Sequence, residues 1–206
     1  MARPVRFKTA IYESATKLFG ERGLSGTGIR EIAREAGVSE AALYRHWKGK
    51  RQLAEDIFQA GMGELDRRLR RVAPADGPAN QAILAVIRNL YEAYDQNSQA
   101  VHYLLLNQHD LWRSMGQSEA NPVTFWFDLL RSRAGEFELT PELSSDILGP
   151  ITLGMVLRPA IAAAYGSIDL PLTQHAEPVA VAICRVLGLP WVTLSDTPAE
   201  PAEPQR

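Results

Sequence analysis

Apolar residues recur every three to four positions along most of the chain, which is the spacing of helices that bury one face. The first such run carries Phe7, Ile11, Ala15 and Leu18 with charged residues between them, and predicts a helix over about residues 5–22. Nowhere does a sustained alternation of apolar and polar residues, the pattern of a half-buried strand, lie between hairpin turn signals. The sequence therefore predicts an all-α fold.

Start and stop signals divide the chain into about nine expected helices. Gly23, Gly37 and Gly49 separate the first four, and Thr27 and Ser39 are the expected N-caps of the second and third. The expected ranges of six later helices are about 28–36, 40–47, 50–73, 79–96, 99–114 and 172–188. A seventh helix is expected to begin at Pro122, after the cap Asn121, and an eighth to span about 141–165.

Residues 29–47, IREIAREAGVSEAALYRHW, have the apolar spacing of two short interlocking helices. Ile32, Ala33 and Leu43 fall where the two helices must pack, and Gly37 falls where the chain must turn. Glycine suits such a turn because it tolerates positive φ. This pattern is typical of a helix-turn-helix that reads DNA.

Charge is distributed unevenly along the chain. The whole sequence of 206 residues has a formal net charge of -2. Residues 1–73 hold 15 Lys+Arg against 9 Asp+Glu, a net charge of +6, which leaves 7 against 15, or -8, for the rest. A basic head on an acidic body favours a DNA-binding function for the head.

Two observations favour a cytoplasmic protein. The single cysteine, Cys184, excludes an internal disulfide framework, and residues 1–8 are polar and basic rather than the start of a signal sequence. The most membrane-like segment is 147–165, but it contains Pro150, Arg158 and Pro159, which a spanning helix rarely combines. We interpret it as a buried helix, and expect no contact with a membrane.

Several short motifs together resemble TetR-type (TetR/AcrR-type) transcriptional regulators. They are Thr27, IREIA at 29–33, AGVS at 36–39, ALYRHW at 42–47 and Lys50. The resemblance is specific over about residues 5–60, and beyond residue 75 it rests on length and helix count. It implies a DNA-binding domain at 5–65 with its helix-turn-helix at about 28–47, and a ligand-binding and dimerisation domain at 75–190. The proline-rich tail, 195–206, is expected to be disordered.

In such proteins the third helix lies in the major groove, and its outward residues reach the bases. Arg45 is the main candidate, because its guanidinium can contact guanine O6 and N7 together, worth roughly 1–3 kcal/mol of discrimination. The other implied DNA-binding residues are Glu40, Ala41 and Ala42 at the bases, and Thr27, Ser39, Tyr44, His46 and Lys50 at the phosphates. Thr27 and Ser39 have an alternative role as helix caps alone.

One short recognition helix reads too few base pairs, so the resemblance implies a homodimer on a palindromic operator. The expected dimer surface is formed by the eighth and ninth helices, which are rich in small residues. The body is expected to enclose a mostly apolar effector site. Its candidate residues are Tyr91, Tyr94, His102, Tyr103, Asn107, Trp112, Trp126, Phe127, Met155 and Arg158. These aromatic residues can equally be plain core, and Arg158 needs a counter-charge in so apolar a helix.

The sequence therefore predicts a ligand-responsive DNA-binding transcriptional regulator, a repressor released by a small, mostly apolar effector. One alternative is a structural DNA-binding protein that recruits a partner without an effector. A second is an α-helical enzyme, with His102 and His109 as metal ligands or an acid-base pair. These histidines are seven residues apart, whereas the zinc-protease motif has a spacing of four with a glutamate between. We expect no catalysis, no metal and no cofactor.

Overall fold

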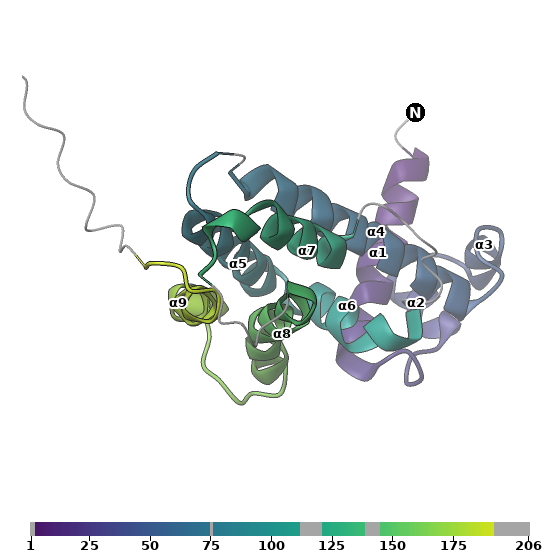
Figure 1. Cartoon of the computed structure of the whole chain (residues 1–206). Helices are drawn as coiled ribbons and strands as arrows, with labels where there is room; N and C mark the ends of the chain where they lie inside the picture. Colours follow the sequence, from purple (N-terminus) through teal and green to yellow (C-terminus); the bar gives the residue numbers. More distant parts are fainter. Residues whose placement is uncertain (1–2, 75, 112–120, 139–144, 192–206) are drawn as a thin grey trace, which may run out of the picture.

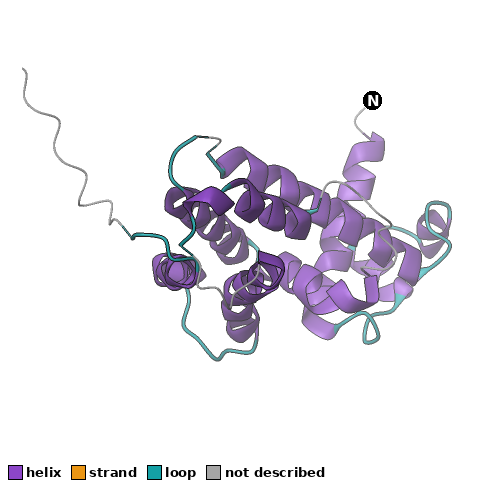
Figure 2. Ribbon diagram, viewed as in Figure 1, coloured by secondary structure: helices purple, strands orange, loops and turns teal. Residues whose placement is uncertain are grey.

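The computed structural model describes residues 3–74, 76–111, 121–138 and 145–191. Within these ranges the chain forms nine α-helices, two short 3-10 helices and no strand, which confirms the all-α prediction (Figures 1 and 2). The α-helices are α1 (Arg3–Arg22), α2 (Ile29–Glu35), α3 (Glu40–Tyr44), α4 (Lys50–Val72), α5 (Ala79–Gln96), α6 (Ser98–Leu111), α7 (Pro122–Ser132), α8 (Ser145–Ala164) and α9 (Ala176–Val186). The 3-10 helices are η2 (Ala134–Glu136) and η3 (Leu172–His175).

The turn and caps of the helix-turn-helix follow the sequence in all but one respect. Gly37 adopts a φ of 66°, and the Ser39 hydroxyl oxygen accepts a hydrogen bond from the backbone N–H of Ala42 at 3.2 Å. The N-cap of α2 is Gly28, whose N–H donates to Glu31 at 2.9 Å, so the prediction that Thr27 caps this helix is wrong. The Thr27 side chain is instead buried under α1.

The third and ninth helices are shorter than expected. α3 ends at Tyr44, three residues early, because the chain turns at Arg45 to bring Trp47 back into the core. Residues Leu172–His175 form the 3-10 helix η3, and the α-helical part of the expected ninth helix begins only at Ala176.

The apolar interior divides into two clusters, one at each end of the molecule. The head core is built from α1 to α4 and is completed by Tyr103 and Leu111 of α6. The body core is built from α5 and α7 to α9, together with Leu69 near the end of α4 and Val101 in the first turn of α6. Thus α4 and α6 each contribute to both cores, and α6 reaches the head although it follows the expected boundary near residue 75.

The junction between α6 and the head is closely packed. The Tyr103 hydroxyl donates a hydrogen bond to the carbonyl of Ala54 in α4 at 2.6 Å, and its ring stacks on Phe19 of α1 at 5.5 Å between centroids. A methyl group added at Gly20 would lie 2.6 Å from the carbonyl oxygen of Gln99, so the backbones of α1 and α6 are almost in contact. Tyr103, expected in the effector site, therefore belongs to the head core instead.

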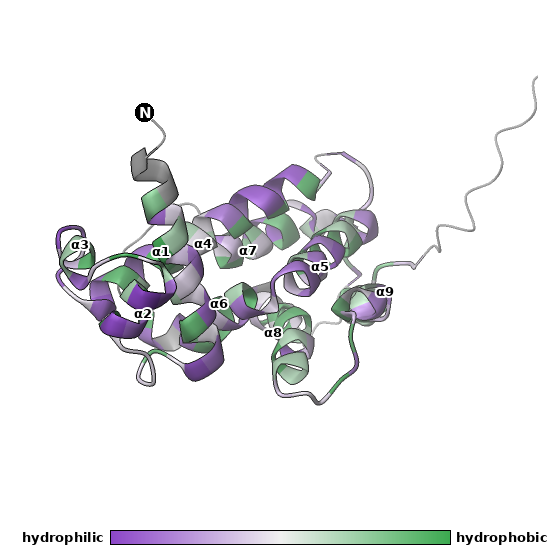
Figure 3. Cartoon of the chain, turned by 180° about the vertical axis from the view of Figure 1, so that it is seen from behind, coloured by the Kyte–Doolittle hydropathy of each residue, from purple (hydrophilic) through white to green (hydrophobic). Residues whose placement is uncertain are grey.

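α8 is apolar but largely uncovered, which corrects the interpretation of residues 147–165 as a buried helix. Ile147 and Ile151 are 46% and 38% exposed, and Figure 3 shows the helix as predominantly hydrophobic. Among the described residues, Asp146–Ala164 is the helix long and apolar enough to cross a membrane, by length and composition only. Arg158 is exposed, so the expectation that it needs an internal counter-charge is also wrong.

Candidate DNA interface and effector cavity

The recognition helix α3 is held to the head by its apolar side. Leu43 is fully buried and Trp47 nearly so. The Trp47 indole N–H donates to the Asp56 carboxylate at 2.7 Å, which ties the end of the helix-turn-helix to α4. The cap at Ser39 fixes the other end of α3, so its orientation is set by contacts on both sides.

The opposite side of α3 and the turn after it are open to solvent. Tyr44 is 53% exposed, and Ala41, Arg45 and His46 are exposed as well. Ala42 is only 6% exposed, so of the four residues expected to face the bases, Ala42 points inward. Its methyl group is covered by the head, and cannot reach a thymine methyl in this arrangement.

The residues expected at phosphates fall into two groups. Thr27 is 1% exposed, and its hydroxyl donates to the carbonyls of Leu18 and Gly23 at 3.1 and 3.0 Å, so it would have to leave these partners to reach DNA. Lys50 donates from Nζ to the carbonyl of Thr27 at 2.7 Å and keeps two further N–H donors. Phosphate binding by Ser39, Tyr44, His46 and Lys50 stays a prediction.

An ion pair between α2 and α3 was not predicted from the sequence. Arg30 Nε lies 3.2 Å from Glu40 Oε1, and the Arg30 side chain is 85% exposed. The pair therefore lies on the same open side as the recognition residues and restrains the carboxylate that is expected to reach the bases. The sequence shows a basic residue in the second expected helix and an acidic residue in the third. Whether the two side chains meet depends on the angle at which the helices cross, which the sequence does not give.

Most of the polar groups expected in the effector site have partners inside the protein. The Tyr91 hydroxyl donates to the carbonyl of Val156 at 2.9 Å, and the Trp126 indole donates to the Thr152 hydroxyl at 3.0 Å. The Tyr94 hydroxyl and His102 Nε2 are 2.6 Å apart. Burial raises the pKa of Tyr94 and lowers that of His102, so both are neutral near pH 7, and the tautomer of His102 sets which of the two groups donates.

The remaining expected effector residues are scattered. Asn107 donates to the carbonyl of Tyr103, Met155 packs against the body core, and Arg158 faces solvent. Trp112 and the side chain of His109 lie outside the described residues. Of the expected residues, Phe127 lines the cavity between α7 and α8.

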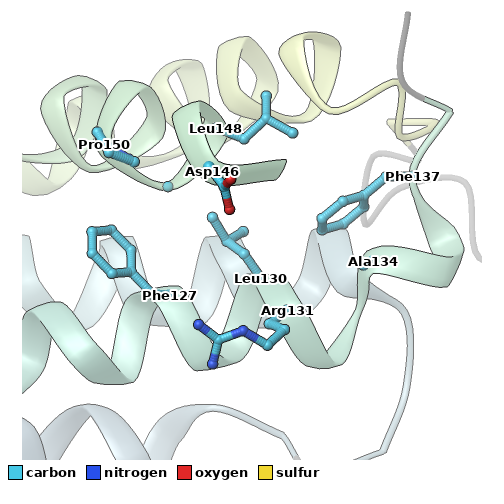
Figure 4. A pocket seen from close by; sticks show the side chains of 9 residues that line it. Phe127, Leu130, Arg131, Ala134, Phe137, Asp146, Leu148 and Pro150 are labelled. Atoms are coloured by element: carbon cyan, nitrogen blue, oxygen red, sulfur yellow. The ribbon is translucent and has the colours of Figure 1, made fainter. Parts of the chain in front are cut away.

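This cavity, of about 320 Å³, lies between α7 and the first turns of α8 (Figure 4). Most of its walls are apolar, with one basic and one acidic side chain. The lining residues are Phe127, Leu130, Arg131, Ala134, Phe137, Asp146, Leu148, Gly149 and Pro150. Its volume is at the lower end of the range for small-molecule sites.

An exposed recognition helix on a compact head, joined to a helical body with a cavity, defines the class of two-domain helical DNA-binding regulators. Residues 11–57 match the family model described as bacterial regulatory proteins, tetR family. The helix-turn-helix domain of this chain therefore belongs to the tetR family, as the sequence motifs predicted.

The comparisons with individual proteins agree with this assignment. The chain is 30% identical over 94 residues to the HTH-type transcriptional repressor KstR2 of Rhodococcus jostii, a match that covers 46% of each protein and thus less than half of the relative's length. It is 23% identical over 155 residues to KstR2 of Mycolicibacterium smegmatis, covering 71% of this chain and 74% of the relative. These names describe transcriptional regulators and not enzymes.

The fold of the whole chain resembles that of a solved regulator. The structure of the transcriptional regulator FadR from Bacillus subtilis in complex with stearoyl-CoA superimposes with a TM-score of 0.75. The superposition covers 88% of this chain and 98% of FadR, at 16% sequence identity. The likeness extends over the body as well as the head.

Proposed function

We propose that this protein is a transcriptional repressor that binds a palindromic operator as a homodimer and releases it when a small, mostly apolar molecule binds the body. The observation that supports DNA binding best is the two-sided recognition segment: Leu43 and Trp47 anchor it, while Tyr44, Arg45 and His46 are exposed. The positive charge of the head and the names of the relatives point the same way. Such a protein acts in the cytoplasm.

The short recognition helix and the uncovered face of α8 support the proposed dimer. α3 has five residues, or about 7.5 Å of helix, which reaches only a few base pairs. Two copies related by a twofold axis would place two such helices in half-sites about one turn of DNA apart. A second copy packed on α8 and α9 would cover Ile147 and Ile151, which are exposed in the single chain.

The test is selection of bound DNA from a random pool by the purified protein. A symmetric motif with two half-sites supports the proposal, and recovery of unrelated sequences contradicts it. Arg45→Ala should then relax the sequence preference, whereas Lys50→Ala should weaken binding to all DNA similarly and lower the slope of log affinity against log salt by about one. Equal loss on specific and random DNA for Arg45→Ala would contradict base reading by Arg45.

Release requires that the effector bind one arrangement of the two heads better than the other. The DNA must then weaken effector binding by the same factor, because the two equilibria are linked. α4 is the structural link, since it begins at Lys50, which donates to the carbonyl of Thr27 in the head, and places Leu69 of its last turn in the body core. A change in the body that tilts α4 would alter the separation of the two heads.

A further inference from the structure

The cavity between α7 and α8 has aromatic residues at its two ends. Figure 4 shows the rings of Phe127 and Phe137 there, with Leu130 and Leu148 between them. The carboxylate of Asp146 points from α8 toward α7, into the space between the rings. An occupant would therefore meet apolar walls over most of its surface and a carboxylate on one side.

Of the two charged side chains at this cavity, the one without a partner in the described part of the protein is the acidic one. The Arg131 guanidinium is paired with Asp128 at 2.8 Å. Asp146 has no hydrogen bond or ion pair with any residue that the structure describes, and it lies more than 4.0 Å from Arg131, since the two form no salt bridge. A free carboxylate favours a cation, and the faces of nearby phenylalanine rings favour a cation as well.

The volume limits the size of the occupant. A molecule of liquid water takes up about 30 Å³, so a cavity of about 320 Å³ holds on the order of ten non-hydrogen atoms. A long acyl chain with a polyanionic headgroup, such as the stearoyl-CoA of the FadR complex, is larger than this volume, and its charge is opposite to the one that Asp146 favours.

We infer that this cavity binds a compact apolar cation of about ten non-hydrogen atoms, with its ammonium group at Asp146 and its apolar part between Phe127 and Phe137. We further assign it as the effector site; that part of the inference rests on the proposed function, whereas binding itself does not.

Gly149 provides a way to fill the cavity with a single methyl group. A Cβ at this position would lie 2.8 Å from Cδ1 of Phe127, too close for any stable contact. The ring must move, and the cavity is the open space beside it. Gly63 in α4 is a matched control, because a Cβ there meets no atom within 4 Å and the substitution is again glycine to alanine within a helix.

The experiment is isothermal titration of the full-length protein at pH 7 with decylamine, 1-decanol and decanoate, the two charged probes below their micelle concentrations and 1-decanol below its solubility limit. These probes have the same chain length and carry a positive, a neutral and a negative head. We expect decylamine to bind about fivefold more tightly than 1-decanol, as for a partly exposed ion pair, and decanoate to bind most weakly. Asp146→Asn should remove the preference for decylamine and leave the affinity for 1-decanol unchanged.

Gly149→Ala should weaken the binding of decylamine and of 1-decanol by tenfold or more, while Gly63→Ala should leave both affinities unchanged. Equal affinity for the three probes, tighter binding of decanoate, or wild-type affinity in Gly149→Ala would overturn the site. Release of the selected operator by decylamine, absent in Gly149→Ala, supports the effector role, and binding without release overturns that role alone. If the protein selects no DNA, the proposed function fails and the titrations still decide the cavity.

Discussion

Removing the Tyr103 hydroxyl tests whether α6 is part of the head. The hydroxyl is buried and donates to the carbonyl of Ala54 at 2.6 Å, whereas the ring that stacks on Phe19 is kept in Tyr103→Phe. A buried hydrogen bond of this kind contributes about 1 kcal/mol net to stability, with a range of roughly 0.5–1.5 kcal/mol. We expect the variant to lose about that much free energy of unfolding, or about 2–4 °C in Tm for a chain of this length.

The assay is urea denaturation followed by circular dichroism at one fixed protein concentration, because the stability of a dimer depends on concentration. Tyr44→Phe is the control: it makes the same chemical change at a side chain that is 53% exposed, and we expect a change within about 0.5 kcal/mol. Equal stability of Tyr103→Phe and the wild-type protein would refute the role of this contact. A separate unfolding step for the head in the wild-type protein would refute the shared core.

Three further predictions follow from the packing, the titration and the ion pair. Gly20→Ala should lower the free energy of unfolding by about 1–3 kcal/mol in urea denaturation, because the new methyl group meets a backbone carbonyl of α6 at 2.6 Å. Gly61→Ala should lower it by less, because its methyl group meets a leucine side chain at 2.9 Å, and that side chain can rotate. Burial lowers the pKa of His102 in the folded state, so the neutral ring contributes to stability above the unfolded pKa of 6.5, and this contribution is lost as the pH falls toward the folded pKa. His102→Gln should therefore make the free energy of unfolding depend less on pH in this range. An unchanged pH profile of stability would contradict this role of His102. Arg30→Ala and Glu40→Gln should change the base preference at the same operator position in DNA selection, and changes at different positions would contradict a shared role.

The sequence predicted those features that depend on neighbouring residues. The turn at Gly37 and the cap at Ser39 are local, and the structure has both. The choice between Thr27 and Gly28 as the cap of α2 is not local, because the Thr27 hydroxyl is taken by the carbonyls of Leu18 and Gly23, and that depends on how α1 packs. Sequence alone ranks threonine above glycine as an N-cap and so favours the wrong residue.

The effector residues were harder to predict, because an aromatic run has no polar face to orient it. In α7, Phe125, Trp126 and Phe127 are consecutive, and successive residues of a helix point about 100° apart. Trp126 turns into the body core and donates to Thr152, while Phe127 turns to the cavity and packs on Gly149. All three are apolar, so only the positions of the other helices decide which one meets the cavity.

The packing at α6 determines where the molecule can change shape. Tyr103 and Gly20 fix α6 to α4 and α1 of the head, while Val101 and His102 in its first half contact the body, so α6 connects the head and the body beside α4. The cavity at Phe127 lies between α7 and α8 of the body. Because α4 is a continuous helix of about 35 Å that enters both cores, a displacement of α7 would act on the body end of α4 and be resisted at its head end. An effector in this cavity can therefore act on the heads through both α4 and α6. Substitutions that loosen α6 from the head should then reduce the coupling between ligand and DNA without changing either affinity alone.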